Sequence, residues 1–508
     1  MKPIKNKIVS VKKLSEIISK LKNKKKIVHC HGVFDLVHVG HIKHFKEARS
    51  FGDILVVTLT QDKYIHKGPN RPVFNEKLRA EYLSSLEIVD YIAINEWPTA
   101  VETIKILKPN FYCKGPDYRN NETDITKKIH EEIKAVKSIK GQIKYTENII
   151  FSSSNLLNQF ADTLSEKQKK LIRVMPYKNF SQIKNQVDEL KNLKVLVIGE
   201  TIIDQYTFCE VLGKSGKDAI MMFKNLYTEQ YAGGAFAVVK HLSQFCNQVT
   251  LLSAVGEKDE KRVFLKNNLE KNIKVNFIKK RNSPTIIKQK FLDNVTKNKL
   301  FGLYTINDDY LDKGDETRFR KSLKRLIPKH DLVILSDYGH GLISKHSAKY
   351  ITNRSPFLAV NAQINAANIG HHVISKYNNF DVGIINEQEL RHELRNREGN
   401  LNHLMKALCK KLKIENLIVT QGTGGARLYE RKNSKFFYCP AFASKVVDKI
   451  GAGDAMMAIT SLALKHKANK SLSLFLGSLA AAQSVEAYGN SKTISKTKLL
   501  SSIKHIMK

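Results

Sequence analysis

Residues 447–464 read VDKIGAGDAMMAITSLAL, a glycine-rich turn that leads directly into an apolar helical run. Gly451 and Gly453 lie just ahead of the expected helix, so several backbone N–H groups point toward one place and can bind an anion. Asp454 follows at that place, and a carboxylate there can accept a proton from a hydroxyl group. Together these groups suit phosphoryl transfer. Taken alone, a Gly-Asp pair before a helix is also an ordinary N-cap.

The sequence around this turn predicts an α/β domain. Runs typical of buried strands occur at KVLVIGE (194–200), DLVILSD (331–337), FDVGIIN (380–386) and ENLIVTQ (415–421), and helical segments separate them. This alternation is typical of a parallel sheet covered by helices.

With Asp448 before it, the turn resembles the second signature of the ribokinase-like (PfkB) sugar kinases. The likeness spans nearly the whole of residues 191–508 through Gly199-Glu-Thr-Ile-Ile-Asp204, Gly233-Gly234-Ala235, Ser336-Asp337-Tyr338, Asn386-Glu-Gln-Glu389 and Thr420-Gln-Gly422-Thr-Gly-Gly425. It implies that Asp454 is the general base and that the N–H groups of Gly451, Ala452 and Gly453 form an anion hole. It further implies substrate binding by Asp204, Gly233, Gly234 and Asp337, nucleotide and phosphate binding by Asn386, Glu389, Thr420, Gly422 and Gly425, and indirect Mg²⁺ binding through Glu389.

Three places depart from the family pattern. Ala237 stands where the family has an asparagine, Lys449 stands where it has a threonine, and Asn361-Ala362-Gln363 stands where heptose kinases have Asp-Pro-Lys. The base and the anion hole stay in place. The departures keep a second interpretation open, in which the kinase-like part only binds a sugar or regulates.

A second candidate site lies near the N-terminus, in His31-Gly-Val-Phe-Asp-Leu-Val-His38-Val-Gly-His41, which follows an expected strand and opens a helix. His38 and His41 would share one face of the first turn, where free N–H groups and the helix dipole favour a phosphate. Two imidazoles there can donate hydrogen bonds to phosphate oxygens and stabilise charge on a phosphorus under attack. Gly32 and Gly40 let a ligand approach the main chain. Without this context, the pair is equally compatible with ordinary surface histidines.

The segment resembles the GxFDxxHxGH signature of the cytidylyltransferase-like nucleotidyltransferases, although His31 stands where related sequences tend to carry asparagine. Further motifs of that family follow in order at Lys67-Gly-Pro-Asn-Arg71-Pro72-Val, Lys114-Gly-Pro-Asp117-Tyr118 and Ser152-Ser153-Ser154-Asn155. The resemblance implies that His38 and His41 stabilise the transition state at the α-phosphate, with Mg²⁺ bridging the triphosphate. It also implies nucleotide or phosphate binding by Gly32, Phe34, Gly40, Lys67, Arg71, Lys114, Asp117, Ser153 and Ser154.

The motifs predict a two-domain α/β protein, with an N-terminal Rossmann-like HxGH nucleotidyltransferase and a C-terminal ribokinase-like kinase. We expect a basic leader helix at 1–26, the nucleotidyltransferase domain at 27–165, a linker at 166–190 and the carbohydrate kinase domain at 191–508. The pairing resembles the bifunctional heptose kinase/adenylyltransferases with the domain order reversed. It implies ATP-dependent phosphorylation of a sugar or sugar phosphate to a sugar 1-phosphate, followed by nucleotidyl transfer from ATP or CTP. The products would be an NDP-sugar, for surface glycan synthesis, and pyrophosphate.

The chain is strongly basic. Its 508 residues include 85 Lys and Arg against 48 Asp and Glu, a formal net charge of +37. Ten lysines and one glutamate lie in residues 1–26, and eleven basic and three acidic residues lie between 258 and 290. Because no nucleic-acid recognition motif accompanies this charge, we expect sugar phosphates and nucleoside triphosphates as partners, and no nucleic acid.

The sequence also predicts the compartment. The six cysteines are scattered without a CxxC pair, which indicates neither a disulfide framework nor a zinc site. The chain has no signal peptide and no run of about 18 apolar residues, so we expect a cytoplasmic protein without membrane insertion. Relatives of both domains imply a homodimer.

Overall fold

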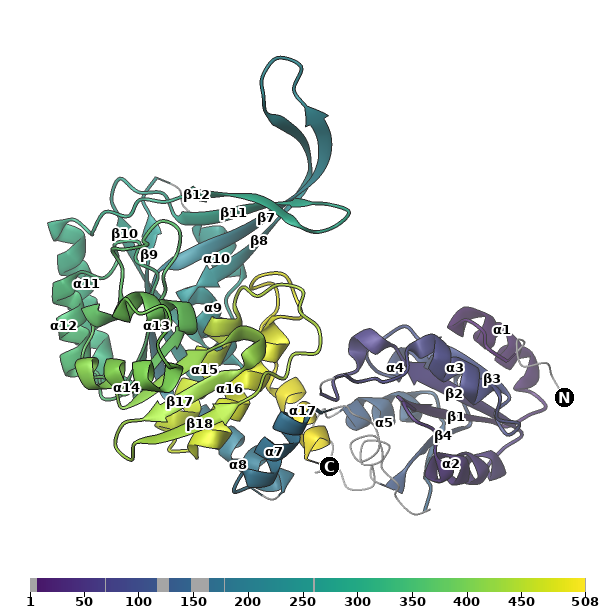
Figure 1. Cartoon of the computed structure of the whole chain (residues 1–508). Coiled ribbons are helices and arrows are strands. Elements are labelled where there is room, and N and C mark those ends of the chain that lie inside the picture. Colours follow the sequence, from purple (N-terminus) through teal and green to yellow (C-terminus); the bar gives the residue numbers. More distant parts are fainter. Residues whose placement is uncertain are drawn as a thin grey trace. The chain divides into compact units, whose positions relative to one another are not determined.

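The computed structural model describes residues 7–68, 70–116, 128–147, 164–177, 179–258 and 261–507. The chain forms two compact units, Met1–Ser165 with Leu500–Lys508 and Glu166–Leu499. Each unit is built on a sheet of mainly parallel strands with helices around it (Figure 1), which confirms the predicted two-domain α/β fold. The segment 166–190, expected as a linker, contains two helices and groups with the second unit.

The first unit contains a five-stranded parallel sheet in the order β3-β2-β1-β4-β5. The strands are β1 (Ile27–Gly32), β2 (Ile54–Thr60), β3 (Tyr91–Asn95), β4 (Phe111–Lys114) and β5 (Gln142–Tyr145). Most residues of β1, β2 and β3 are buried, as expected for strands covered on both faces. The strand order reverses at β1, because β2 and β3 are added on one side of β1 and β4 and β5 on the other. Ligands of such sheets bind at the carboxyl ends of the strands beside this reversal.

Helices cover both faces of this sheet. They are α1 (Val11–Leu21), α2 (Val39–Ser50), α3 (Glu76–Ser84), α4 (Val101–Leu107) and α5 (Lys128–Ser138). On one face, α2 and α3 pack against Val28 and Cys30 of β1, and on the other face α1 packs against Ile27. Helix α1 buries Val11, Leu14 and Ile18 at helical spacing while its lysines point outward, so the basic leader helix is a packed part of this unit.

The second unit contains a nine-stranded sheet in the order β10-β9-β6-β13-β14-β15-β16-β17-β18, parallel except at the β16–β17 and β17–β18 pairs. A smaller sheet has the order β12-β11-β7-β8. The strands are β6 (Lys194–Gly199), β7 (Thr201–Lys214), β8 (Met221–Gly234), β9 (Gln248–Gly256), β10 (Ile273–Lys280), β11 (Ile286–Asp293), β12 (Lys299–Thr305), β13 (Leu332–Asp337), β14 (Leu358–Ala362), β15 (Val382–Asn386), β16 (Asn416–Thr420), β17 (Ala426–Glu430) and β18 (Lys435–Cys439).

The helices from residue 166 onward are α7 (Glu166–Val174), α8 (Phe180–Glu189), α9 (Ala235–Ser243), α10 (Arg262–Asn267), α11 (Lys313–Leu326), α12 (Lys345–Arg354), α13 (Glu387–Leu394), α14 (Leu401–Leu412), α15 (Ala452–Lys465), α16 (Lys470–Ser484) and α17 (Lys496–Ile506). The main core of the second unit joins α11 to α14 to one face of the large sheet. Helices α9, α15 and α16 pack together on its other side. The hairpin of β7 and β8 extends away from the small sheet (Figure 1).

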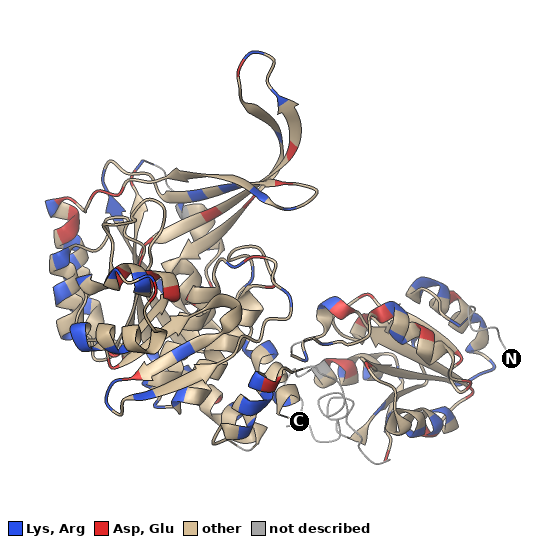
Figure 2. Ribbon diagram, in the orientation of Figure 1, with Lys and Arg blue, Asp and Glu red and all other residues tan. Residues whose placement is uncertain are grey.

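The positive charge is spread over the outer helices, among them α1 in the first unit and α11 and α12 in the second (Figure 2). All six cysteines are buried free thiols. Among the described residues, none of the helices is both long enough and apolar enough to cross a lipid bilayer.

Candidate active sites

The glycine-rich turn of the second unit forms the N-terminus of α15. Gly451 is the N-cap with a φ of 85°, a conformation that costs glycine nothing. A Cβ placed on Gly453 would meet no atom within 4 Å, so the space beside it is open. The first N–H groups of a helix lack intrahelical acceptors, so Gly451, Ala452 and Gly453 have the arrangement expected of an anion hole.

Asp454 lies in the first turn of α15, beside this open space. Its Oδ1 accepts a hydrogen bond of 2.8 Å from the hydroxyl of Tyr338, which follows β13. Burial raises the pKa of Asp454 to about 7, with the negative charge of Asp204 adding to the effect while Tyr338 and Lys288 oppose it. A carboxylate with a pKa near neutrality suits a general base.

Asp204, on β7, lies near Asp454. Its carboxylate accepts a hydrogen bond of 2.9 Å from Asn490 Nδ2 and lies 3.6 Å from Lys290 Nζ. A Cβ on Gly233 of β8 would stand 2.1 Å from Asp204 Oδ2, so only glycine leaves room for this carboxylate. Gly234 caps α9 with a φ of 62°. The predicted substrate ligands Asp204, Gly233 and Gly234 therefore lie together.

Lys288 and Lys290 of β11 face the same site, and sequence reasoning missed both. Lys288 is 8% exposed, and its Nζ lies 5.2 Å and 5.7 Å from the ring centroids of Tyr304 and Tyr338. Burial lowers its pKa, while Asp204 and Glu200 raise it. Among the described residues, the Lys288 ammonium makes no hydrogen bond or ion pair. The available signal was their spacing, because residues i and i+2 share one face of a strand.

Asp337, predicted as a substrate ligand, is fully buried at the end of β13. Its carboxylate accepts hydrogen bonds from Lys376 Nζ at 2.8 Å, from the Tyr377 hydroxyl, and from Gly339 N at 3.0 Å. Glu200 likewise accepts hydrogen bonds from the backbone N–H groups of Tyr338 and His340. The Asp337 oxygens thus accept hydrogen bonds from within the unit, and these bonds hold the loop that carries Tyr338.

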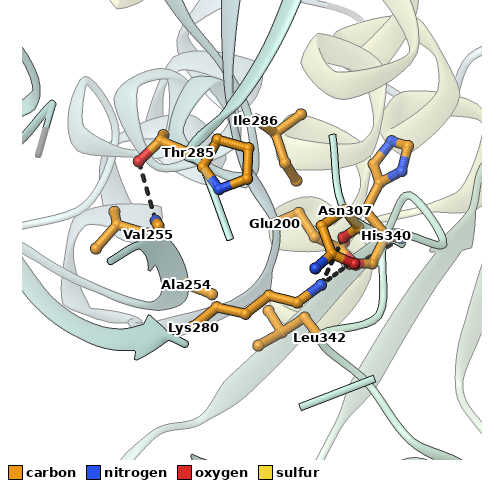
Figure 3. A pocket seen from close by; sticks show the side chains of 11 residues that line it. Glu200, Ala254, Val255, Lys280, Thr285, Ile286, Asn307, His340 and Leu342 are labelled. Carbon is orange, nitrogen blue, oxygen red and sulfur yellow. Dashed lines mark hydrogen bonds between the residues drawn. The ribbon is translucent and has the colours of Figure 1, made fainter. Parts of the chain in front are cut away.

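A cavity lies where the ends of β9 and β10 meet the start of β11 (Figure 3). Lys280 Nζ donates hydrogen bonds to the backbone oxygens of Asn307 at 2.6 Å and His340 at 3.1 Å. Thr285 Oγ1 accepts a hydrogen bond of 3.0 Å from Gly256 N. These hydrogen bonds hold the ends of β9 and β10 against the neighbouring loops, at the point where β11 of the small sheet begins.

The predicted nucleotide ligands of the second unit lie at the carboxyl ends of β15 and β16. Asn386 and Glu389 form a capping box at the start of α13, and Glu389 Oε1 also accepts the N–H of Ile364 at 3.0 Å. Burial raises the pKa of Glu389, and these hydrogen bonds oppose the rise. Both Glu389 oxygens thus accept backbone hydrogen bonds, and the indirect contact of Glu389 with magnesium stays a prediction.

Thr420 ends β16, and the glycine-rich loop after it turns back toward β17. Gly422 and Gly425 have φ values of 58° and 86°. A Cβ on Gly422 would meet no atom within 4 Å, whereas one on Gly425 would stand 2.2 Å from the backbone oxygen of Cys439. The loop thus presents open backbone at Gly422. Of the departures from the family pattern, Ala237 is buried in α9, and Gln363 and Lys449 are exposed.

The histidine pair of the first unit lies at the N-terminus of α2. His38 is the N-cap, and its Nδ1 accepts a hydrogen bond of 3.1 Å from Gly40 N. The ring centroids of His38 and His41 are 4.1 Å apart. Burial, followed by the charges of His38, His44 and Lys67, lowers the pKa of His41 to about 3, and burial also lowers the pKa of His38. Both rings are therefore neutral imidazoles.

Two motifs of the first unit meet in an ion pair. Arg71 Nη1 donates a hydrogen bond of 3.1 Å to Asp35 Oδ2, and both side chains are almost fully buried. Asp35 Oδ1 accepts the N–H groups of Val73 at 2.8 Å and Phe74 at 3.1 Å. The aspartate of the first motif thus holds the loop that carries Lys67 and Arg71.

Other predicted ligands of the first unit also have intramolecular contacts. Lys114, at the end of β4, is buried and lies 2.9 Å from Glu132 Oε2. Phe34 has a φ of 47°, and its buried ring packs against His41 at a centroid distance of 5.3 Å. A Cβ on Gly32 would lie 3.0 Å from that ring. The predicted ligands Asp117, Ser153 and Ser154 lie outside the described residues.

A chain of polar contacts between β1 and β2 was missed by sequence reasoning. Thr58 Oγ1 lies 2.7 Å from His29 Nε2 and 2.9 Å from His31 Nδ1, and Thr60 Oγ1 lies 3.2 Å from His31 Nε2. His31 and Thr58 are register partners in β1 and β2. The sequence signal was weak, because polar residues in a buried strand indicate a partner without identifying it.

Comparison with known proteins finds two family models, whose matches overlap over residues 192–281. Residues 192–497 match the family model of the pfkB family carbohydrate kinases, and residues 29–281 match the cytidylyltransferase-like family model. The Bifunctional protein HldE of Aliarcobacter butzleri (strain RM4018) is 42% identical over 146 residues, which make up 28% of this chain and 30% of that protein. HldE of Helicobacter pylori (strain ATCC 700392 / 26695) is 39% identical over 151 residues, which make up 28% of this chain and 32% of that protein. The chain thus matches about a third of the length of these relatives.

Among solved structures, Phosphofructokinase-2 from Escherichia coli in complex with potassium is similar to 62% of this chain and is itself covered completely. The sequence identity is 11% and the TM-score is 0.50, so this likeness concerns the fold alone. The pfkB family model covers more than half of the chain, and the geometry of the α15 turn agrees with it. The chain therefore belongs to the pfkB family of carbohydrate kinases, and it also carries a cytidylyltransferase-like region.

Proposed function

We propose that this chain performs two consecutive steps of sugar activation. The second unit would phosphorylate a sugar phosphate with ATP to give ADP and a sugar bisphosphate that carries a new 1-phosphate. The first unit would then transfer a nucleotidyl group from ATP or CTP to that 1-phosphate, with release of pyrophosphate. The observation that carries the proposal is the arrangement at α15, where Asp454 has a pKa of about 7 beside open backbone N–H groups and the buried ammonium of Lys288.

In the kinase step, Asp454 would accept the proton of the acceptor hydroxyl. The hydroxyl oxygen then attacks the γ-phosphorus of ATP, and ADP leaves. The N–H groups of Gly451, Ala452 and Gly453 would stabilise the negative charge on the transferring group, and Tyr338 would hold Asp454 in place. Mg²⁺ on ATP supplies charge neutralisation, and Glu389 would contact it through water.

Lys288 supports an anionic acceptor. A buried ammonium without a charged partner carries a large desolvation cost, which a bound phosphate or carboxylate would offset. Lys290 lies two residues further along the same strand face, 3.6 Å from Asp204, so two ammonium groups line this side of the site. A phosphate on the acceptor would pair with the Lys288 ammonium, whereas a neutral sugar would leave that ammonium without an ion-pair partner.

In the transferase step, the phosphate oxygen of the sugar 1-phosphate would attack the α-phosphorus of ATP or CTP, and pyrophosphate would leave. The neutral rings of His38 and His41 can donate hydrogen bonds to the α-phosphate without forming a covalent intermediate. Bound with the triphosphate, Mg²⁺ would neutralise part of its negative charge. The NDP-sugar would serve surface glycan synthesis, with both steps in the cytoplasm.

We further propose a homodimer. The β7–β8 hairpin and β12 expose large apolar side chains, with Leu212 at 61%, Ile220 at 54% and Leu303 at 54% exposure. Sedimentation velocity on the full chain tests this. Leu212→Glu together with Leu303→Glu should convert a dimer to a monomer, whereas a wild-type monomer at micromolar concentration would contradict the proposal.

The two-step proposal is tested by incubating the full chain with ATP, CTP and panels of neutral sugars and sugar phosphates, and following products by ³¹P NMR. We expect a sugar 1-phosphate signal first, a pyrophosphate signal afterwards, and turnover of phosphorylated acceptors only. Lys288→Met should raise the KM for the phosphorylated acceptor at least tenfold, about 1.4 kcal/mol. Pyrophosphate release without ADP production on any acceptor would favour the alternative, in which the kinase-like unit only binds a sugar or regulates.

A further inference from the structure

We propose that Lys299 is a positioning residue for phosphoryl transfer, because its ammonium group ties the small four-stranded sheet to the carboxylate that organises the anion-hole turn. This inference rests on the kinase function proposed above. It concerns residues that lie outside the predicted set of ligands.

Asp448 is the centre of this arrangement. It lies three residues before Gly451 and is 5% exposed. Its Oδ1 accepts hydrogen bonds from Lys299 Nζ at 2.7 Å and from Ile450 N at 3.3 Å. Its Oδ2 accepts hydrogen bonds from the Tyr206 hydroxyl at 2.8 Å and Gly489 N at 3.2 Å. One carboxylate therefore joins β7, β12, the segment after α16 and the turn itself.

The residues that surround the Asp448 carboxylate are closely packed, above all around Tyr206. Tyr206 is fully buried. Gly489 has a φ of 46°, and a Cβ there would stand 2.6 Å from the Tyr206 hydroxyl. On the other side, a Cβ on Gly451 would stand 2.5 Å from Asn490 Oδ1. Small shifts of Asp448 would therefore be transmitted to Gly451, the first residue of the anion hole.

Among the described groups that donate hydrogen bonds to Asp448, the Lys299 ammonium is the one that carries a positive charge. Burial alone would raise the pKa of Asp448, but the hydrogen bonds from Lys299 and Tyr206 hold that pKa below its usual range. A charge-assisted pair of this length is stronger than a bond between neutral groups. Without the ammonium, a buried negative charge would stand uncompensated beside the place where the transferred phosphate develops its own negative charge.

Lys299 also couples the small sheet to catalysis. It is the first residue of β12, an edge strand that pairs with β11 through a register shift at Phe291/Leu292. Its side chain is 43% exposed, so the stem runs over the surface while the ammonium reaches Asp448. The ion pair requires the small sheet to lie over the turn, and that same sheet carries Lys288. The ion pair thus links the sheet that carries Lys288 to the anion-hole turn.

The test compares Lys299→Met, Lys299→Arg and a control, Lys224→Met, in the full chain. Lys224 lies on β8 of the same sheet, and its side chain and that of its partner Glu210, 3.8 Å away, are both exposed. We expect Lys299→Met to lower the kinase kcat about 10- to 100-fold, as a small displacement of reacting groups does. The KM for the acceptor should change less than twofold, Lys299→Arg should retain most of the kcat, and Lys224→Met should match the wild type. Pyrophosphate release by the first unit should stay unchanged in all three variants.

Chemical rescue adds a readout that a merely structural role would not move. Methylammonium should restore part of the kcat of Lys299→Ala and have no effect on Lys224→Ala. An unchanged kcat in Lys299→Met, or an equal loss in Lys224→Met, would overturn the inference.

Hydrogen exchange keeps the inference separate from the proposed function, because it requires no turnover. The amides of residues 447–455 should exchange faster in Lys299→Met than in the wild type or Lys224→Met. Unchanged exchange there would refute the role of Lys299. Absence of kinase turnover in the wild type would instead refute the proposed function.

Discussion

The candidate sites of the two units use the same backbone element but different side-chain chemistry. Each lies at the N-terminus of a helix, where free N–H groups and the helix dipole favour a phosphate. At α2 the first turn carries two neutral imidazoles, whereas at α15 it carries a carboxylate with a pKa of about 7.

This difference matches the nucleophile that each proposed step requires. The phosphate oxygen of a sugar 1-phosphate is already anionic, so the first site needs hydrogen-bond donors and no base. A sugar hydroxyl must lose its proton during attack, so the second site needs a base whose pKa lies near the working pH.

The two sites also differ in how their cations are held. In the first unit, Arg71 and Lys114 are paired with Asp35 and Glu132. In the second unit, the buried ammonium of Lys288 has no such partner among the described residues. The first site is thus organised by its own ion pairs, and the second has positive charge available for a ligand.

The largest expected effect separates the two sites by removing the base. Asp454→Asn keeps the side-chain size and abolishes proton acceptance, so we expect the kinase kcat to fall about 10²- to 10⁴-fold. Pyrophosphate release from a supplied sugar 1-phosphate should be unchanged. ADP and pyrophosphate assays on the same preparation measure both. Asp218→Asn, on the exposed β7–β8 hairpin, is the matched control. Loss of both activities in Asp454→Asn would contradict the existence of two independent sites.

The reciprocal change removes a donor from the first site. His41→Ala should lower pyrophosphate release about 10²- to 10³-fold, as loss of one transition-state donor does. ADP production by the second unit should remain at the wild-type rate. His403→Ala, on α14, serves as the control because the side chain is exposed. An unchanged rate of pyrophosphate release in His41→Ala would show that His41 does not act on the α-phosphate.

The pH dependence should distinguish the sites next. Because the pKa of Asp454 is raised, the carboxyl is protonated and inactive as a base below about pH 7 and ionised above it. The kinase kcat/KM should therefore rise about tenfold per pH unit up to that value and then level off. The small residual activity of Asp454→Asn should lack this inflection. A profile that is flat between pH 5.5 and 8 in the wild type would exclude Asp454 as the titrating base.

Local patterns made much of the fold and part of each site predictable. The GAGD turn and the capping box at Asn386 depend on residues within four positions of one another, which sequence displays directly. The spacing of Leu14 and Ile18 likewise predicts an amphipathic helix. The density of lysines there indicated only a basic leader helix, and the packing of that helix against Ile27 and the sheet became evident only from the structure.

Contacts between distant segments were not predictable in this way. Lys299 and Asp448 are separated by 149 positions, and Asp204 and Asn490 by 286. A sequence motif names a residue but not its partner. Lys114 and Asp337 were therefore predicted as ligands, although Glu132 and Lys376 already engage them. Lys288 was not predicted as a ligand, because nothing nearby in the sequence distinguishes a buried lysine from an exposed one.

The smallest expected effect concerns Lys449, which departs from the family pattern inside the α15 turn. Its side chain is exposed, and the contacts that fix the turn come from Asp448 and the backbone of Gly451. Restoring the family residue with Lys449→Thr should therefore change the kinase kcat and KM less than twofold and the free energy of unfolding by less than about 0.5 kcal/mol. Steady-state kinetics and urea denaturation measure this, with Lys445→Thr, also exposed in the same loop, as the control. A tenfold gain in kcat for Lys449→Thr alone would mean that the charge at this position, and not the position of the N–H groups, limits phosphoryl transfer. The contrast between the two sites would then depend on a surface charge in the turn as well as on the base.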